Sequence, residues 1–339
     1  MIGPNAEETF LGGYSDVPRQ TVSVLEAITS YVGAEAEVVF APGVRVTTDH
    51  NWYTDEVELA DEEENRQTIL EATELAATAD LVILAVGGNE KTSREGWAET
   101  HLGDRTSLDL VGQQEDLVRA VVETGVPTVV VLVHGRPLSV NYIAENVPAI
   151  LDAWYLGQET GTAIAKALFG DVNPGGKLPV TIPRSVGQLP SFYNHKPTAR
   201  RGYLFDTTEP LWPFGFGLSY TTFRIENPEL EKSEIKVGES TTLKVEVVNS
   251  GEVAGDEVVQ LYIRDLVSSV TRPVQELKGF QRVHLAPGES QTVAFSIGTE
   301  QFQFFDRDMQ RIVEPGEFEL MIGSSSQDLK TVLLTVTAD

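Results

Sequence analysis

The chain has 339 residues, of which 41% are hydrophobic, so it can form about two domains with substantial cores. It contains no cysteine, which excludes disulfides, thiolate zinc sites, iron–sulfur ligation and cysteine nucleophiles. Acidic residues outnumber basic ones by 51 to 25, and the formal charge of −26 repels phosphate backbones, so no nucleic-acid partner is expected. This excess of carboxylates fits a halophilic protein, because salt screens their mutual repulsion, although an ordinary acidic protein has the same composition.

Apolar runs along the chain are short. No run reaches about 18 residues, so we expect neither a transmembrane helix nor a membrane partner. Residues Met1 to Tyr14 lack the basic and apolar regions of a signal peptide, which favours a cytoplasmic location. The five histidines are scattered, and we predict neither a metal site nor a cofactor.

The first half of the chain alternates segments of helical periodicity with short apolar runs. This alternation predicts an α/β domain with an open, mostly parallel sheet flanked by helices. The apolar runs are continuous, which indicates strands covered on both faces. The expected helices span 21–32, 65–79, 111–124 and 161–169, and the expected strands span 36–40, 81–86, 128–133 and 149–154.

The pattern changes after residue 170. Residues 190–222 are rich in proline, glycine and aromatic side chains and show no periodicity, which indicates an ordered linker held by its aromatics. From residue 223 onward, short alternating runs are separated by turn residues, which predicts an all-β sandwich. We therefore expect an α/β domain (1–189), the linker (190–222) and a β-sandwich domain (223–339). Its strands are expected over 241–249, 258–264, 276–284, 290–297 and 318–322.

A long polar loop follows the strand predicted over 81–86 and extends to Leu108. Ligands of open α/β sheets bind beyond the carboxyl ends of the strands, so this loop is the first candidate for a site. It contains carboxylates, arginines, a histidine and Trp97. A tryptophan beside a carboxylate suits sugar chemistry, because the ring can stack on a pyranose face while the acid acts on the glycosidic oxygen. The alternative is a solvated acidic loop with Trp97 packed inward.

Other chemistries lack their motifs. Gly87-Gly88 is not part of a G-x-G-x-x-G motif, and no phosphate-binding G-x-x-x-x-G-K-[ST] motif occurs, so a nucleotide site is not expected. No G-x-S-x-G nucleophile elbow is present. His134 follows a buried strand and is interpreted as a structural residue at the strand end.

Several distinctive motifs occur in a fixed order along the chain. They are Ile2-Gly3-Pro4-Asn5-Ala6, Gly175-Gly176-Lys177-Leu178-Pro179 with Pro183, Tyr203 with residues 213–223, Val258-Val259-Gln260-Leu261-Tyr262 and Glu276-Leu277-Lys278-Gly279-Phe280. Together they resemble the C-terminal half of glycoside hydrolase family 3, a family of β-glucosidases, β-xylosidases and exo-glucanases. The resemblance covers essentially the whole chain and implies an α/β sandwich domain followed by a fibronectin type III-like domain.

The resemblance implies a retaining β-glycosidase acting on terminal glucosides or xylosides. Such enzymes carry an aspartate nucleophile on an N-terminal (β/α)₈ barrel and a general acid/base glutamate on the α/β domain, with the two carboxyl groups about 5–5.5 Å apart. Several members place this glutamate five residues before an Asp-Arg pair, and Glu99 stands five residues before Asp104-Arg105. Glu99 is therefore the expected acid/base, with Glu95 as its rival and Glu90 as a weaker alternative.

Four further loop residues complete the expected site. Trp97 would border the leaving-group subsite. Arg94, Asp104 and Arg105 would bind substrate and shape the loop, with an arginine–carboxylate pair holding Glu99 in place.

The nucleophile's barrel motif does not occur in this sequence. We therefore expect two partners: a β-linked glycoside or oligosaccharide, and an N-terminal barrel half that these residues do not contain. With one carboxylate the double displacement cannot start, so the chain alone is predicted to be inactive. The alternative function is a non-catalytic carbohydrate-binding or interaction module derived from such an enzyme.

Overall fold

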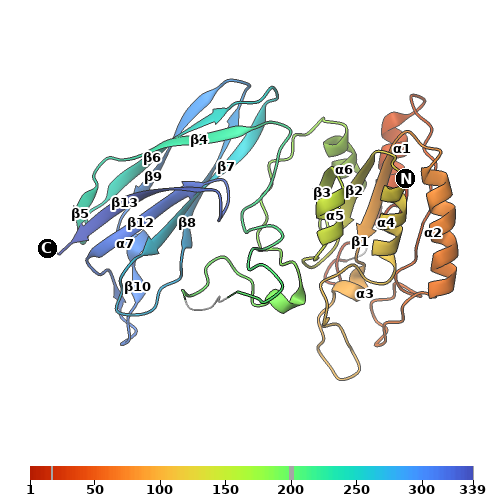
Figure 1. The fold of residues 1–339 in the computed structure, drawn as a ribbon, viewed down its shortest axis with the longest axis horizontal. Helices are drawn as coiled ribbons and strands as arrows, with labels where there is room; N and C mark the ends of the chain where they lie inside the picture. The colour runs from red at the N-terminus through yellow and green to blue at the C-terminus, as the bar shows by residue number, and fades with distance from the viewer. Residues whose placement is uncertain (17, 198–201, 339) are drawn as a thin grey trace. The chain divides into compact units, whose positions relative to one another are not determined.

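The computed structural model describes residues 1–16, 18–197 and 202–338. Within them the chain folds into two compact units. Helices flank the sheet of the first unit, whereas the second consists almost entirely of strands (Figure 1). The first unit comprises Met1–Val172 and Pro183–Leu189, and the second comprises Asn173–Ile182 and Pro190–Asp339.

Helices and strands alternate along the first unit, so the predicted α/β class is confirmed. The strand predicted over 128–133 has the bounds expected. The predicted helices differ from the observed ones by a few residues. The strands are β1 (Val82–Gly87), β2 (Thr128–Val133) and β3 (Ala149–Asp152). The helices are α1 (Val24–Val32), α2 (Glu62–Ala76), α3 (Glu90–Ser93), α4 (Gln114–Glu123), α5 (Asn141–Asn146), α6 (Thr160–Leu168) and the 3₁₀ turn η1 (Val186–Gln188).

Two single-residue bridges extend the parallel sheet formed by β1, β2 and β3. β1 pairs with β2, and β2 pairs with β3, in parallel register. Ile2 forms parallel bridges to Leu84 of β1 and to Ala41. The spatial order is therefore Ala41, Ile2, β1, β2, β3, which is 2-1-3-4-5 in order of appearance along the chain.

The strand predicted over 36–40 is not formed. Ala41, just beyond it, reaches the sheet through a single bridge. Ala41 makes both bonds of this bridge, since its amide donates to the Met1 carbonyl and its carbonyl accepts the Gly3 amide, each at 3.1 Å. A tight turn, in which the Val44 amide donates to the Pro42 carbonyl at 2.7 Å, then ends the extended segment.

Side chains alternate between the two faces of the sheet. Ile83 of β1 and Val131 of β2 pack in one buried cluster with Ile28 of α1 and Ile164 of α6. The neighbouring residues on each strand face the opposite side, where α4 packs against β1 and α2. β1 and β2 are therefore covered on both faces, as their continuous apolar runs predict, whereas the edge strand β3 is only partly buried.

Acidic residues take part in capping the first two helices of this unit. Ser23 Oγ accepts a hydrogen bond from the Glu26 amide at 3.2 Å, and Glu26 Oε2 accepts one from the Ser23 amide at 2.9 Å. This capping box starts α1. Asp61 Oδ1 accepts the amides of Glu63 and Glu64 at the start of α2. Part of the acidic composition thus stabilises helix N-termini, where negative charge is favoured.

The second unit is a sandwich of two sheets, ordered β5-β13-β12-β7-β8 and β4-β6-β9. Neighbouring strands are antiparallel except for the parallel pair β13 and β5. Side chains from both sheets, among them Leu243, Leu261 and Leu320, form one buried core. The strands are β4 (Phe223–Leu230), β5 (Glu234–Lys236), β6 (Thr241–Asn249), β7 (Gly255–Asp265), β8 (Glu276–Leu285), β9 (Ser290–Ile297), β10 (Phe304–Phe305), β11 (Arg311–Ile312), β12 (Gly316–Gly323) and β13 (Leu329–Thr337), with the short helix α7 (Thr299–Phe302).

Aromatic contacts hold the segment expected to be a linker. In its described residues no helix or strand forms, and a single bridge joins Trp212 to Ile182. Tyr193 stacks on Phe214 with ring centroids 4.3 Å apart and meets Tyr262 of β7 edge-on. The domain boundaries drawn from the sequence stay a prediction, because the compact units exchange short segments around residues 173–189.

Candidate functional site

The switch point of the first sheet lies between Ile2 and β1, where the chain order reverses. The segments that follow these two positions therefore border the crevice in which α/β sheets bind ligands. Asn5 Nδ2 joins them by donating to the Gly88 carbonyl at 2.8 Å. Gly87 has φ +150°, and a Cβ there would lie 2.0 Å from the Val133 carbonyl oxygen, so only glycine fits where β1 enters this crevice.

One helical turn, α3, connects β1 to the long polar loop. Asn89 starts it, because its side chain accepts the Thr92 amide at 3.0 Å and donates to Thr47 Oγ1 at 2.8 Å. Glu90 Oε1 accepts the amides of Leu11 and Gly12, both at 3.1 Å. Glu90, the weaker candidate for the acid/base, is thus engaged by backbone donors.

Arg94 ends α3 and lies inside the protein, with 2% of its surface exposed. Its guanidinium donates to the carbonyls of Leu102 at 2.7 Å, Trp52 at 3.0 Å, Thr54 at 2.7 Å and Asp55 at 2.6 Å. These bonds occupy the head group with backbone oxygens of two segments. The geometry gives Arg94 a role in shaping the loop and leaves its head group turned away from solvent.

Glu99 lies in a turn at the tip of the loop. The His101 amide donates to the Ala98 carbonyl at 3.2 Å, and the Trp97 amide donates to the His101 carbonyl at 3.4 Å. These two bonds enclose Glu99, whose side chain is exposed. Its rival Glu95 is also exposed, but it follows Arg94 directly and lies outside this turn.

Two aromatic rings flank the buried imidazole of His101. The Trp97 ring centroid lies 4.9 Å from that of His101, and the Trp52 centroid lies 6.1 Å from it. Trp97 nevertheless has 75% of its surface exposed, so it is not packed inward. A rigidly backed, solvent-facing indole is suited to stacking on a sugar ring.

Asp104 and Arg105 bond within the loop region. Asp104 Oδ1 accepts the Gly96 amide at 3.1 Å, and Arg105 Nη2 donates to the Asp109 carbonyl at 2.5 Å. Burial, followed by the nearby charge of Arg136, lowers the pKa of Arg105. Over the described residues neither arginine of the expected set forms an ion pair with Glu99, and both guanidinium groups bind backbone carbonyls instead.

Sequence reasoning missed the segment 49–56, which lies against the loop. Lys91 of α3 is buried, and its Nζ pairs with Asp49 Oδ1 at 2.7 Å and donates to the Glu56 carbonyl at 3.3 Å. The hydrogen bond from Lys91 lowers the pKa of Asp49. The available signal was the aromatic pair Trp52-Tyr53 within an otherwise polar run.

His134 has a structural environment, as the sequence suggested. Its Nε2 lies 2.6 Å from Asp152 Oδ1, and the other carboxylate oxygen accepts Trp154 Nε1 at 3.1 Å. Close by, the Tyr155 hydroxyl contacts Ser93 Oγ at 3.0 Å, and burial raises the pKa of Tyr155 to about 12. This cluster fixes the ends of β2 and β3 under α3.

Other types of site are not found in the described residues. No group of three or more His, Asp or Glu side chains there is arranged to hold a metal ion. Among the same residues, every helix is too short or too polar to span a membrane.

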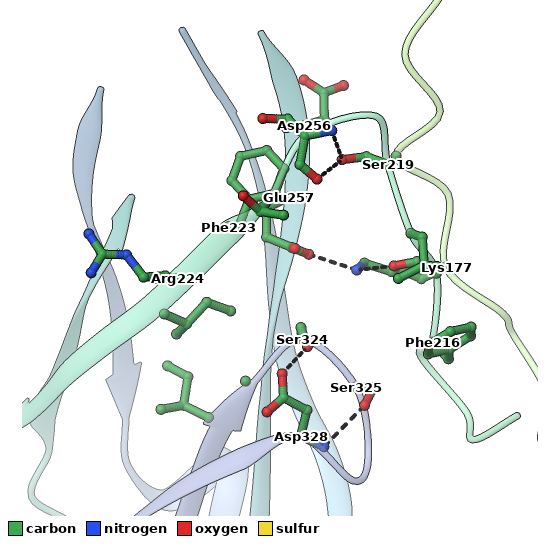
Figure 2. A pocket seen from close by; sticks show the side chains of 18 of the residues that line it. Lys177, Phe216, Ser219, Phe223, Arg224, Asp256, Glu257, Ser324, Ser325 and Asp328 are labelled. Atoms are coloured by element: carbon green, nitrogen blue, oxygen red, sulfur yellow. Dashed lines mark hydrogen bonds and ion pairs between the residues drawn. The ribbon is translucent and has the colours of Figure 1, made fainter. Parts of the chain in front are cut away.

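The second unit contains an open pocket of about 470 Å³ (Figure 2). Lys177 and Glu257 point toward each other in its wall, with Nζ and Oε1 2.8 Å apart, and Lys177 also donates to the Gly217 carbonyl. Ser324 Oγ donates to Asp328 at 2.5 Å on the facing hairpin. These polar groups satisfy one another, so the pocket offers fewer groups for a ligand than the loop edge of the first unit.

Comparison with known proteins decides the family. The glycosyl hydrolase family 3 C-terminal domain matches residues 1–220, and the fibronectin type III-like domain matches residues 257–326. The chain belongs to glycosyl hydrolase family 3. The membership expected from the sequence motifs is therefore confirmed, together with the two-part fold that it implies.

Relatives of this family 3 chain are longer proteins. The β-xylosidase of Formosa agariphila is 44% identical over an alignment 350 residues long, which covers 99% of this chain and 46% of the relative. The periplasmic β-glucosidase of Salmonella typhimurium is 37% identical, with 97% of this chain and 45% of the relative covered. A solved β-glucosidase structure from Erythrobacter marinus superposes with a TM-score of 0.95 at 47% identity, over 99% of this chain and 46% of that one. The chain thus spans about half the length of the relatives it matches.

Proposed function

We propose that this chain forms the C-terminal part of a retaining β-glycosidase that hydrolyses terminal β-D-glucosidic or β-D-xylosidic bonds. Glu99 is its general acid/base. The observation that carries the proposal is the placement of Glu99: an exposed carboxyl group in a closed turn, at the carboxyl edge of the sheet beside its switch point. Family membership supports the reaction class, because named relatives are β-xylosidases and β-glucosidases.

Exposed aromatic side chains support a sugar-binding role for the same edge. Ile2, Ala41 and β1 are neighbouring positions in the parallel sheet. The chain segments that leave these three positions carry Tyr14, Tyr53 and Trp97, respectively. Their surfaces are 96%, 87% and 75% exposed, respectively. Exposed apolar groups gathered on one surface can mark a ligand-binding site. Sugar rings present C–H faces that stack on such side chains, so the edge is suited to a glycoside.

Glu99 would act twice in each catalytic cycle. It first donates its proton to the glycosidic oxygen as the leaving group departs, and it then takes a proton from the water that releases the glycosyl group. The nucleophilic carboxylate comes from the N-terminal part of the complete enzyme, about 5–5.5 Å from the acid/base. Trp97, two residues before Glu99, is placed to border the leaving-group subsite, and Asp104 and Arg105 keep the loop shaped around it.

The test uses a complete enzyme in which this chain replaces the corresponding part of the Erythrobacter marinus β-glucosidase. Glu99→Gln keeps the size and hydrogen bonding of the side chain but removes its proton. We expect a loss of about 10²–10⁴-fold on cellobiose or xylobiose and a much smaller loss of glycosylation on dinitrophenyl glycosides, whose leaving groups need no acid. Added azide should restore turnover of the activated substrates, because this anion attacks without a general base.

Glu95→Gln is the matched control, because it removes the other exposed glutamate of the loop. It should change both substrate classes alike. If Glu95→Gln shows the dependence on the leaving group and Glu99→Gln does not, the acid/base is Glu95. If the complete enzyme binds oligosaccharides without hydrolysing them, the chain is the non-catalytic binding module instead.

A further inference from the structure

Arg94 buries a full positive charge without a carboxylate partner. Its four hydrogen bonds all end on backbone carbonyls, and it forms no ion pair within the described residues. Burying a charge is costly unless hydrogen bonds replace its hydration. Four charge-assisted bonds supply that replacement here, and they require the planar arrangement of donors that only arginine has.

The four carbonyls belong to two segments far apart in the sequence. Leu102 lies eight residues after Arg94, so this bond closes the loop that contains Glu99 between its two ends. Trp52, Thr54 and Asp55 lie about forty residues earlier, on the segment 49–56. One guanidinium therefore fixes both ends of the loop to a second segment.

Other contacts make the same junction tighter. Arg136 Nη2 donates to the Arg94 carbonyl at 2.6 Å and approaches the Gly103 carbonyl at 3.4 Å. A Cβ at Gly103 would lie 2.6 Å from the Arg94 carbonyl oxygen, so the two ends of the loop meet closely only because this residue is glycine. Lys91 ties the same α3 turn to both ends of the segment 49–56.

We propose that Arg94 is the positioning residue for the acid/base: it holds the loop 94–104 on the segment 49–56, so that Glu99 meets the glycosidic oxygen in one geometry. This inference rests on the proposed function of Glu99. It adds the segment 49–56 to the site as the surface against which the loop is fixed. The exposed ring of Tyr53 is presented by that surface, because Arg94 holds the carbonyls of the residues on either side of it.

The first experiment uses the 339-residue chain alone and does not depend on catalysis. Arg94→Lys keeps the charge but cannot span four carbonyls. Amide hydrogen exchange should rise at least about tenfold in both 49–56 and 94–104, since hydrogen bonds to charged groups are lost from each. Exchange in β1 and β2 should stay unchanged. The matched control is Arg66→Lys, because Arg66 is an exposed arginine of α2 that pairs with Glu62 and Glu63 on its own helix. Unchanged exchange in either segment of Arg94→Lys would overturn the proposal.

The second experiment measures positioning in the complete enzyme. Arg94→Lys should lower kcat on cellobiose or xylobiose by about 10–100-fold, because a displacement of about 1 Å can cost two orders of magnitude. With azide present, turnover of dinitrophenyl glycosides should fall by less than about threefold, since they need no proton in the first step and azide needs no general base in the second. Equal losses on both substrates, together with a lower melting temperature, would mean that Arg94 merely supports the fold and would refute a positioning role.

Glu99→Gln is run in parallel to separate this inference from the proposed function. If Glu99→Gln shows no dependence on the leaving group, the proposed function fails, and the exchange experiment alone decides whether the two segments are joined. If Arg94→Lys is not soluble, the contact is tested by NMR on the unmodified chain instead. Its Arg94 Nε–H should then give an NMR signal with exchange slowed at least about tenfold relative to exposed arginines. An unprotected Arg94 signal would exclude the contact on which the proposal stands.

Discussion

Arg94 of the first unit and Lys177 of the second are both buried cations, but they are neutralised in different ways. Lys177 pairs with the carboxylate of Glu257, and their side chains are only 13% and 8% exposed. Arg94 meets carbonyl oxygens and no carboxylate in the described structure. A carboxylate cancels one charge at one point, whereas a set of carbonyls lets one charge organise several stretches of backbone. The first arrangement fastens a pocket wall, and the second shapes a loop that carries a candidate catalytic group.

The largest expected effect is the difference in activity between the 339-residue chain alone and the complete enzyme. The 339-residue chain alone should show no turnover of aryl β-glucosides or β-xylosides, because no nucleophile is expected in either unit and the double displacement cannot start. Purified chain is assayed at concentrations far above those of the complete enzyme. Turnover that disappears in Glu99→Gln would show that a nucleophile lies within these residues.

The Lys177–Glu257 pair should contribute to the stability of the sandwich unit as a whole. Lys177→Met leaves the Glu257 carboxylate buried without its partner, which costs about 3–5 kcal/mol. Urea denaturation measures the change in the free energy of unfolding, and amide hydrogen exchange in β7 measures it locally. Arg94→Lys, by contrast, should leave exchange in β7 unaltered.

A double variant tests whether the charge or the packing matters at this pair. Lys177→Met combined with Glu257→Leu removes both charges, and we expect it to recover most of the loss within about 1 kcal/mol. If the double variant is as unstable as Lys177→Met, the side chains contribute through packing and not through their charges.

Salt should stabilise both units. At a net charge of −26 the folded chain repels itself, and the Debye length falls from about 30 Å at 0.01 M to about 3 Å at 1 M salt. The melting temperature should therefore rise with KCl, by about 2–4 °C for each kcal/mol gained. The loss caused by Lys177→Met should be the same at both salt concentrations, because a buried pair is screened little. A melting temperature that does not change with KCl concentration would remove the halophilic interpretation and leave an acidic protein.

The smallest effect concerns pH at the loop edge. His50, on the segment 49–56, is hydrogen-bonded to Glu8, which raises the pKa of the imidazole despite its partial burial. A raised pKa in the folded state means that the stabilisation is complete below about pH 6.5 and is lost as the pH rises through the folded-state value. Because both side chains are about half exposed, the contribution is below about 0.5 kcal/mol. The stability difference between wild type and His50→Gln should shrink from pH 6 to pH 8, and a constant difference would contradict it.

Local pattern predicted the framework of the fold because strands and helices are set by short-range periodicity. β2 and β6 have the bounds expected from their alternation. β13 was missed although its run of Leu, Val and Thr is typical of a strand. The strands β10 and β11 have two residues each, which is too short to give a periodic signal. The run at 36–40 failed as a strand because its contact with the sheet is confined to the bridge of Ala41 and one hydrogen bond from the Met1 amino group to the Val39 carbonyl.

The candidate site was predicted only in part, because its geometry depends on residues far apart in the sequence. The sequence indicated the loop and nominated Glu99 within it, through spacing and family resemblance, and the role of Glu99 stays a prediction. It could not reveal that Arg94 is buried, since its partners are main-chain oxygens of Trp52, Thr54 and Asp55, and carbonyls leave no trace in residue identity. The burial of Lys91 likewise depends on Asp49, which lies on a segment that has neither helical nor strand periodicity.

Contact through main-chain oxygens also has a consequence for how such a site can diversify. Arg94 recognises the path of the backbone and no side chain of the segments it joins. The exposed ring of Tyr53 can therefore be exchanged without altering the Arg94 hydrogen bonds, and exchange of Trp97 alters only its ring contact with His101. Under the proposed function, preference for the departing alcohol and efficiency of proton delivery would be separately adjustable traits, one encoded on the surface and the other in the interior.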